Sequence, residues 1–105
     1  MADVTMKKGD RLPLLSGTMT LNGAAVNLTG ATVTFRMRRV GTGASQVNAA
    51  ATVTNAAAGR VQYAWAAGDT DVPGLYRGEW VASFAGLAQT HPGDTYLVIE
   101  ILDTL

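Results

Sequence analysis

The side chains that could carry out chemistry in this sequence are few and scattered. The single histidine, His91, lies in Thr90-His91-Pro92-Gly93, a segment typical of a turn. A catalytic histidine needs a nucleophile and an orienting carboxylate beside it. The three serines, Ser16, Ser45 and Ser83, lie in unrelated places and outside any motif that exposes a nucleophile. We therefore predict that His91 is an ordinary turn residue and that the protein is not an enzyme.

Carboxylates offer a second kind of chemistry, metal binding. Asp69, Asp71 and Asp94 could meet at one end of a β-sandwich and present oxygen ligands to calcium. The segment Asp69-Thr70-Asp71 lacks the further ligands and the glycine of a calcium-binding loop. Asp and Thr also form turn hydrogen bonds without a metal, which is the interpretation we prefer. The sequence has no cysteine, so it holds no disulfide or thiolate metal site, and we expect no cofactor.

Aromatic and arginine side chains could bind sugars or phosphates. The aromatic residues alternate with small or polar residues, which turns them toward the core rather than toward a glycan. They are Tyr63, Trp65, Tyr76, Trp80 and Phe84. Arg36, Arg38 and Arg39 form the only basic cluster of the sequence. We expect these arginines to be solvated or paired across strands, beside Arg77 and Glu79.

Polar and apolar residues alternate with a period of two, which is typical of half-buried strands. In residues 31–39 the apolar positions are Val33, Phe35 and Met37. The same alternation marks residues 60–65, 75–84 and 94–102, and we assign a strand to residues 47–58 as well. Pro13 places the first strand at a sheet edge, because proline cannot donate to a neighbouring strand.

The clearest turn signal is Asn22-Gly23. Both residues tolerate the positive φ that a two-residue hairpin turn requires. The turn pairs Leu21 with Ala24, Met19 with Val26 and Gly17 with Leu28. In this register the large apolar residues share one face, so turn chemistry and hydrophobic pattern predict the same hairpin.

Length and composition limit the class of protein. The chain has 105 residues, of which 48% are apolar and 15% are charged, and its formal net charge is zero. This composition excludes a disordered tail and gives no electrostatic reason to expect nucleic acid or an anionic membrane as a partner. No apolar stretch is long enough for a signal peptide or a membrane helix. We predict a flexible N-terminal arm over residues 1–9 and a single β-sandwich domain over residues 10–105.

Short strands with turns every few residues predict an all-β fold, an immunoglobulin-like antiparallel β-sandwich of about seven to eight strands. The segment Pro73-Gly74-Leu75-Tyr76 favours the immunoglobulin-like form. A tyrosine at this point can turn its hydroxyl back to the preceding corner, as in the tyrosine corner of such sandwiches. The acidic residue usual four positions earlier is Val72 here.

The predicted last strand has an unusual outward face. Its outward positions are Tyr96, Val98, Glu100 and Leu102, three of which are apolar or aromatic. In a chain with so little charge, such a face is a poor design for a free protein, and we expect a neighbouring subunit to cover it. The candidate interface comprises Met6, Lys7, Lys8, Arg36, Arg38, Tyr96, Val98 and Leu102.

Four stretches together carry a family resemblance. They are Leu28–Met37, Gly59–Trp65, Gly68–Trp80 with its Pro-Gly-Leu-Tyr segment, and Phe84–Ile101 with Thr90-His91-Pro92. Their order and spacing resemble the N-terminal immunoglobulin-like domain of phage baseplate upper proteins and similar small β-domains of tailed-phage virions. The likeness spans about residues 10–102. Members of that family usually continue into a longer region for oligomerisation or receptor contact, which this sequence does not contain.

The resemblance implies a structural role in a tailed-phage virion, as a tail, baseplate or neck adaptor that docks in a symmetric homo-oligomer. The implied partners are other virion proteins, without nucleic acid or membrane, and the implied location is the virion, assembled in the host cytoplasm. One alternative is a capsid decoration or cement protein. From a different class, a carbohydrate-binding module for host attachment would require outward aromatic residues and carboxylates.

Overall fold

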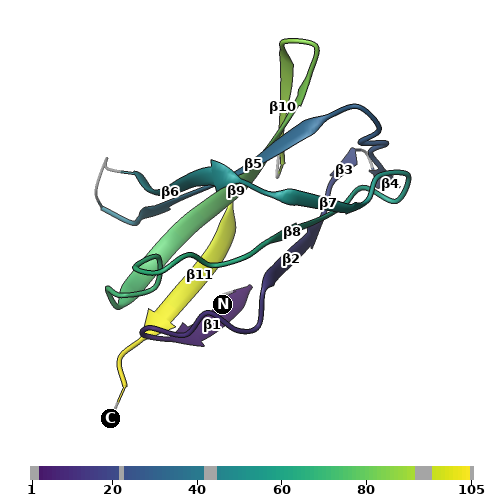
Figure 1. Cartoon of the computed structure of the whole chain (residues 1–105). Helices are drawn as coiled ribbons and strands as arrows, with labels where there is room; N and C mark the ends of the chain where they lie inside the picture. The colour runs from purple at the N-terminus through teal and green to yellow at the C-terminus, as the bar shows by residue number, and fades with distance from the viewer. Residues whose placement is uncertain (1–2, 22, 42–44, 92–95, 105) are drawn as a thin grey trace.

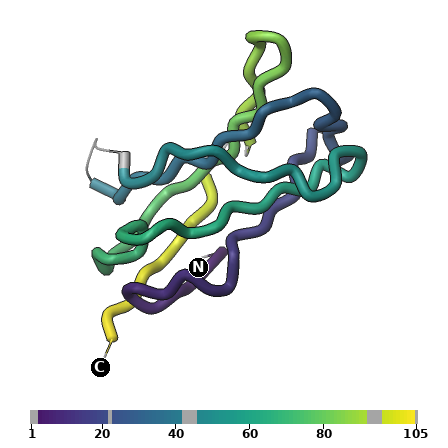
Figure 2. Tube along the Cα trace, viewed as in Figure 1, coloured from purple at the N-terminus to yellow at the C-terminus, as the bar shows by residue number. Residues whose placement is uncertain are grey.

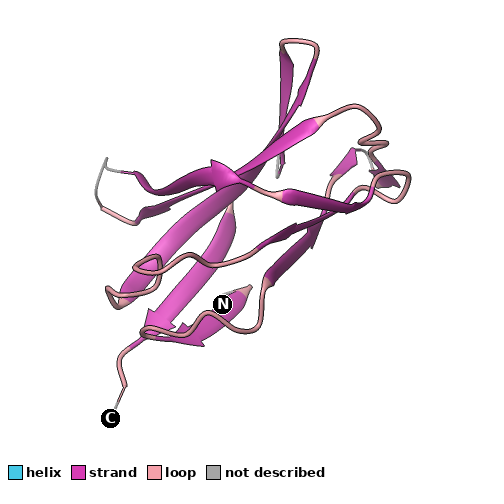
Figure 3. Ribbon diagram, viewed as in Figure 1, coloured by secondary structure: helices cyan, strands magenta, loops and turns pink. Residues whose placement is uncertain are grey.

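The chain forms two layers of β-sheet (Figure 1). The apolar core lies between them. The structure is a computed structural model and describes residues 3–21, 23–41, 45–91 and 96–104. Strands and loops make up this part of the chain, which contains no helix (Figure 3) and so none that could cross a membrane. The all-β sandwich prediction is confirmed, and the described residues form eleven strands where about seven to eight were predicted.

The larger layer is a six-stranded sheet in the order β1-β11-β9-β5-β6, with β10 paired to β9. Its strands are β1 (Val4–Lys7), β5 (Thr32–Arg39), β6 (Ser45–Ala50), β9 (Gly74–Phe84), β10 (Leu87–His91) and β11 (Leu97–Leu102). The long strand β9 is its axis, because β5 pairs along one edge of β9 and β11 and β10 pair along the other. All neighbours are antiparallel except β1 and β11, which run parallel.

The smaller layer has the strand order β2-β8-β7, and a short hairpin, β3–β4, lies beside it. The strands are β2 (Leu15–Thr18), β3 (Thr20–Leu21), β4 (Ala24–Ala25), β7 (Thr52–Asn55) and β8 (Arg60–Tyr63). The chain crosses between the layers at Ala51, whose amide donates to the Val33 carbonyl at 2.8 Å. Figure 2 shows this path from β6 to β7. The predicted strand over residues 47–58 is therefore two strands, one in each sheet.

The core follows from the alternation within the strands. Inward side chains of β5 and β9 are almost fully buried, among them Phe35, Tyr76 and Trp80. The smaller sheet contributes Val61 and Tyr63, and Trp65 follows shortly after β8. The predicted core aromatics are thus confirmed, except that Phe84 at the end of β9 is only half-buried.

The prediction of an arm over residues 1–9 is wrong for its central part. Val4–Lys7 forms strand β1, in parallel register with β11 from Val4 opposite Ile99 to Lys7 opposite Leu102. Met6 points inward and is 5% exposed. The alternation is hidden in the sequence because the strand is four residues long and only Val4 and Met6 carry it. Pairing with β11 supplies the backbone hydrogen bonds that so short a strand requires.

The strand β10 was missed, and His91 is its last residue rather than part of a turn. The strand β10 pairs with the end of β9 from Leu87 opposite Phe84 to His91 opposite Trp80, and β11 then begins with Leu97 opposite Gly78. The strands β10 and β11 therefore occupy the same edge of β9, one after the other. The β9–β10 hairpin extends away from the sandwich (Figure 1).

The predicted Asn-Gly hairpin is confirmed near its turn and wrong further away. Leu21 pairs with Ala24, and the Val26 amide donates to the Met19 carbonyl at 2.9 Å. Gly17 instead pairs with Val61 on β8. Pairing with β8 extends over all four residues of β2, and the inward residues of β8 face the core, which favours this partner over a longer Asn-Gly hairpin. Asn22 lies outside the described residues.

The tyrosine corner is present. The Tyr76 hydroxyl donates to the Val72 carbonyl at 2.6 Å, four residues earlier in the chain. Because the acceptor is a backbone oxygen, the acidic side chain that is missing at Val72 is not needed for this bond. Burial raises the pKa of Tyr76, which keeps its hydroxyl protonated and able to donate.

Replacing Tyr76 by phenylalanine is expected to lower the free energy of unfolding by about 1–2 kcal/mol, because the part-buried Val72 carbonyl loses its donor. Urea denaturation of Tyr76→Phe and wild type measures the difference. The same change at the exposed Tyr96 serves as the control, with an expected effect within about 0.5 kcal/mol. Equal effects at the two sites would contradict a stabilising corner bond.

Candidate docking surface

Within the described part of the chain, the side chains considered for catalysis or metal binding do not assemble into a site. Among the residues that the structure describes, no three His, Cys, Asp or Glu side chains are grouped to hold a metal ion. His91 ends β10, Ser16 lies on β2 and Ser83 lies on β9. Asp94, the third carboxylate of the predicted calcium alternative, lies outside the described residues.

Asp69 has the turn role that its sequence predicts. Its carboxylate accepts hydrogen bonds from the Tyr63 hydroxyl and from the Ala66 amide, the latter at 2.8 Å. Burial raises the pKa of Tyr63 to about 12, and the Asp69 carboxylate adds to the effect by hydrogen bonding and by its charge. The Asp69 carboxylate therefore connects the loop after β8 to the core through these two hydrogen bonds.

The burial of Tyr63, together with its bond to Asp69, makes the stability of the fold decrease at alkaline pH. Tyr63 ionises near pH 10 in an unfolded chain and near 12 in the folded one, so its contribution is complete below pH 10 and is lost as the pH rises toward 12. We expect wild type to lose about 1–2 kcal/mol more than Tyr63→Phe between about pH 9 and about pH 12. Urea denaturation across this range measures both proteins. Parallel pH profiles would contradict the assignment.

The outer face of the six-stranded sheet, which points away from the smaller sheet, carries a mixed surface of arginine and apolar side chains. Its rows follow from the strand register. In one row Arg38 lies opposite Arg77, which lies opposite Val98. In the next row along the strands, the Val40 amide donates to the Leu75 carbonyl at 2.8 Å and Leu75 lies opposite Glu100.

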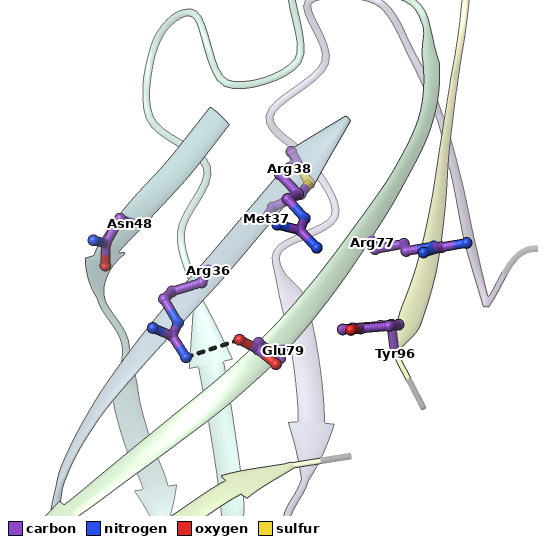
Figure 4. A pocket seen from close by; sticks show the side chains of 7 residues that line it. All are labelled: Arg36, Met37, Arg38, Asn48, Arg77, Glu79 and Tyr96. Carbon is purple, nitrogen blue, oxygen red and sulfur yellow. Dashed lines mark hydrogen bonds and ion pairs between the residues drawn. The ribbon is translucent and has the colours of Figure 1, made fainter. Parts of the chain in front are cut away.

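Two contacts order the charged part of this face (Figure 4). Arg36 forms an ion pair with Glu79 at 2.8 Å, so the predicted pairing across strands is confirmed for this residue. The Arg77 guanidinium lies over the Tyr96 ring, 5.4 Å from its centroid, which is the geometry of a cation–π contact. With Arg38 and Asn48, these side chains line a shallow pocket of about 310 Å³.

An apolar part borders the arginines. Val40 and Leu75 are neighbours on the same face and are 43% and 45% exposed, and Leu102 on β11 is 38% exposed. Val40 and Leu75 lie side by side, and Leu102 lies one row beyond Glu100, so the three apolar side chains share one face with the arginines. An apolar patch bordered by polar side chains is a candidate contact surface for another protein. We define the docking face as Arg36, Arg38, Val40, Leu75, Arg77, Glu79, Tyr96, Val98, Glu100 and Leu102.

The structure brings together five of the eight residues predicted as the interface. Arg36, Arg38, Tyr96, Val98 and Leu102 lie on the docking face, although Val98 is half-buried.

The remaining three are not part of the docking face. Lys7 is exposed on β1, opposite Leu102, and Lys8 follows it. Met6 is buried in the core and cannot be part of an interface, which corrects that prediction. Reasoning from the sequence missed Val40 and Leu75, which could have been found by extending the alternation of β5 and β9 to their ends.

Comparison with known proteins supports the fold. No family model matches the sequence, and no curated protein matches it. Among solved structures, the chain is similar to the N-terminal domain of phage TP901-1 ORF48, with a TM-score of 0.64 and 11% sequence identity. The match covers 97% of this chain and 84% of that chain. At this identity the likeness concerns the arrangement of strands, and the immunoglobulin-like topology stays a prediction.

Proposed function

We propose that this protein is a structural component of a tailed-phage virion, a tail, baseplate or neck adaptor that acts by docking to other virion proteins and to symmetric copies of itself. Two observations support the proposal. The fold is similar to a domain of a phage protein over nearly the whole chain. The docking face also leaves Val40, Leu75 and Leu102 open to solvent on a single sheet surface, and this observation carries the argument.

A carbohydrate-binding module is less well supported. Such a module uses aromatic rings exposed on one surface, whereas Tyr63, Trp65 and Trp80 are buried here. Tyr96 is exposed, but Arg77 lies over its ring. A docking role makes use of both the arginines and the apolar side chains of this face.

Mass spectrometry of gradient-purified particles from the phage that encodes this chain tests the proposed location. The chain is expected in stoichiometric amounts with other structural proteins, and cryo-electron microscopy then places it in the tail, baseplate or neck. Density on the capsid surface would indicate a decoration or cement protein instead. Absence of the chain from purified particles would overturn the proposal.

The docking face itself is tested by the double variant Leu75→Asp, Leu102→Asp. We expect its free energy of unfolding to fall by about 1–2 kcal/mol, because each aspartate lies near Glu100, while the variant stays folded and its incorporation into particles falls at least about tenfold. The control is Leu87→Asp, at an exposed leucine on the β9–β10 hairpin. Normal incorporation of the double variant would refute docking through this face.

A further inference from the structure

Among the described residues, the docking face carries charges of both signs that form no ion pair within the chain. Arg38 lies directly opposite Arg77 on the neighbouring strand. Like charges in this position destabilise a sheet. The pocket beside them is also lined by the carboxylate of Glu79, which is already bonded to Arg36. Within the described ranges, neither Arg38 nor Arg77 forms an ion pair.

Glu100 provides the complementary charge on the same face. It lies one row from Arg77, opposite Leu75 on β9 and Thr5 on β1. Its side chain is half-buried, and it too forms no ion pair within the part of the chain that the structure describes. The docking face thus carries two neighbouring arginines without an ion pair and, one row away, a carboxylate without an ion pair.

We propose that two copies of this chain dock through this face, with Glu100 of each copy bound to Arg77 and Arg38 of the other. This inference rests on the proposed function and names the partner of its docking face. The proposed two-fold axis lies in the plane between the two docked faces and passes midway between Arg77 and Glu100. Rotation about this axis places Glu100 of one copy against Arg77 of the other, and Arg77 of the first copy against Glu100 of the second. Both contacts therefore form at once. A surface that carries both halves of a contact is what a two-fold symmetric interface requires.

The residues near such an axis fit the same arrangement. Leu75 and Val98 occupy the other diagonal of the square formed with Arg77 and Glu100, so they lie close to the axis and meet their own counterparts. Their contact removes apolar surface from water at the centre of the interface and shields the surrounding ion pairs. The zero net charge of the chain leaves no overall repulsion between two copies.

Charge reversal tests the pairing in the isolated protein by analytical ultracentrifugation and native mass spectrometry. Wild type is expected to dimerise, and Arg77→Glu and Glu100→Arg are each expected to weaken the dimer at least about tenfold, because each places like charges together twice. The decisive sample is a mixture of the two variants. In the heterodimer the introduced glutamate of one chain faces the introduced arginine of the other, and the native Glu100 and Arg77 face each other at the second contact. Heterodimers are therefore expected to exceed both homodimers.

The double variant Arg77→Glu, Glu100→Arg restores opposite charges across the interface and should dimerise within about threefold of wild type. The control is Arg60→Glu, on the exposed face of the smaller sheet, which should not change dimerisation. Circular dichroism of each variant confirms that it folds. A monomeric wild type, undisturbed dimers of both single variants, or a mixture without heterodimers would each overturn the inference.

The outcome is separable from that of the proposed function. If the charge variants leave self-association unchanged while the chain is found in particles, the two-fold contact is wrong and the virion role stands. If wild type is monomeric but the face binds an acidic segment of another virion protein, the second copy is likewise the wrong occupant. If the dimer behaves as expected but the chain is absent from particles, the virion role is wrong.

Discussion

Gly59→Ala is expected to lower the free energy of unfolding by about 3–5 kcal/mol, a large fraction of the stability of a domain of this size. Gly59 has a φ of +69°, and a Cβ atom there would lie 2.6 Å from the Met19 carbonyl oxygen and 2.9 Å from that of Val26. These are backbone atoms, held in place because the Met19 amide donates to Gly59 and the Val26 amide donates to Met19. Alanine would therefore break the junction between β2, the β3–β4 hairpin and β8.

The matched control is Gly30→Ala. Gly30 has a φ of +80°, but nothing lies within 4 Å of its added Cβ. Gly30→Ala is expected to lower the free energy of unfolding by about 1–2 kcal/mol, the penalty of the left-handed backbone conformation alone. Urea denaturation of both variants separates the conformational contribution from the steric one. Similar losses at the two glycines would show that close packing at Gly59 is unimportant.

Phe35→Ala is the second substitution with a large expected effect, also about 3–5 kcal/mol. Phe35 is fully buried on β5. The centroid of its ring lies 4.9 Å from the ring centroid of Trp80, 5.1 Å from that of Tyr63 and 6.0 Å from that of Trp65. Trp80 belongs to the larger sheet, whereas Tyr63 lies on the smaller one and Trp65 shortly after it. Removing the ring leaves a cavity where the two layers meet.

Denaturation and near-ultraviolet circular dichroism check this expectation, since the two tryptophans lose an ordered neighbour. The comparison is Phe84→Ala, the same change at a half-buried position at the end of β9. Phe84→Ala should lower the free energy of unfolding by less than half as much as Phe35→Ala, because water can fill the space that the ring leaves. A loss at Phe84 as large as that at Phe35 would place the stabilising centre of the sandwich elsewhere.

The predictable parts of the fold are those with strong local patterns. Strand β9 alternates over most of its length, and its Tyr76 hydroxyl reaches the Val72 carbonyl as the corner motif predicts. The strand β1 escaped prediction because it is short and draws its stability from a partner far away in sequence. Its parallel pairing with β11 has no local signal at all. The strand β10 escaped because its residues are mostly polar or small and do not alternate clearly.

The candidate site was predictable in the same uneven way. Alternation along one strand was enough to point Tyr96 and Leu102 outward. It could not show that Leu75 lies opposite Glu100, or that Arg38 lies opposite Arg77, because those neighbours depend on the register between strands. Met6 was assigned to the surface for the related reason that an unpaired segment was expected where a strand exists.

The pairing of β1 with β11 also governs when the protein can finish folding. Strand β1 leaves the ribosome long before its partner, since Val4 faces Ile99. During synthesis β1 therefore remains unpaired, and Met6 stays exposed to solvent, until β11 has been made. Contacts between residues so distant in sequence also form slowly. In a nascent chain that stalls before β11 leaves the exit tunnel, β1 therefore lacks its partner strand and is accessible to chaperones and proteases.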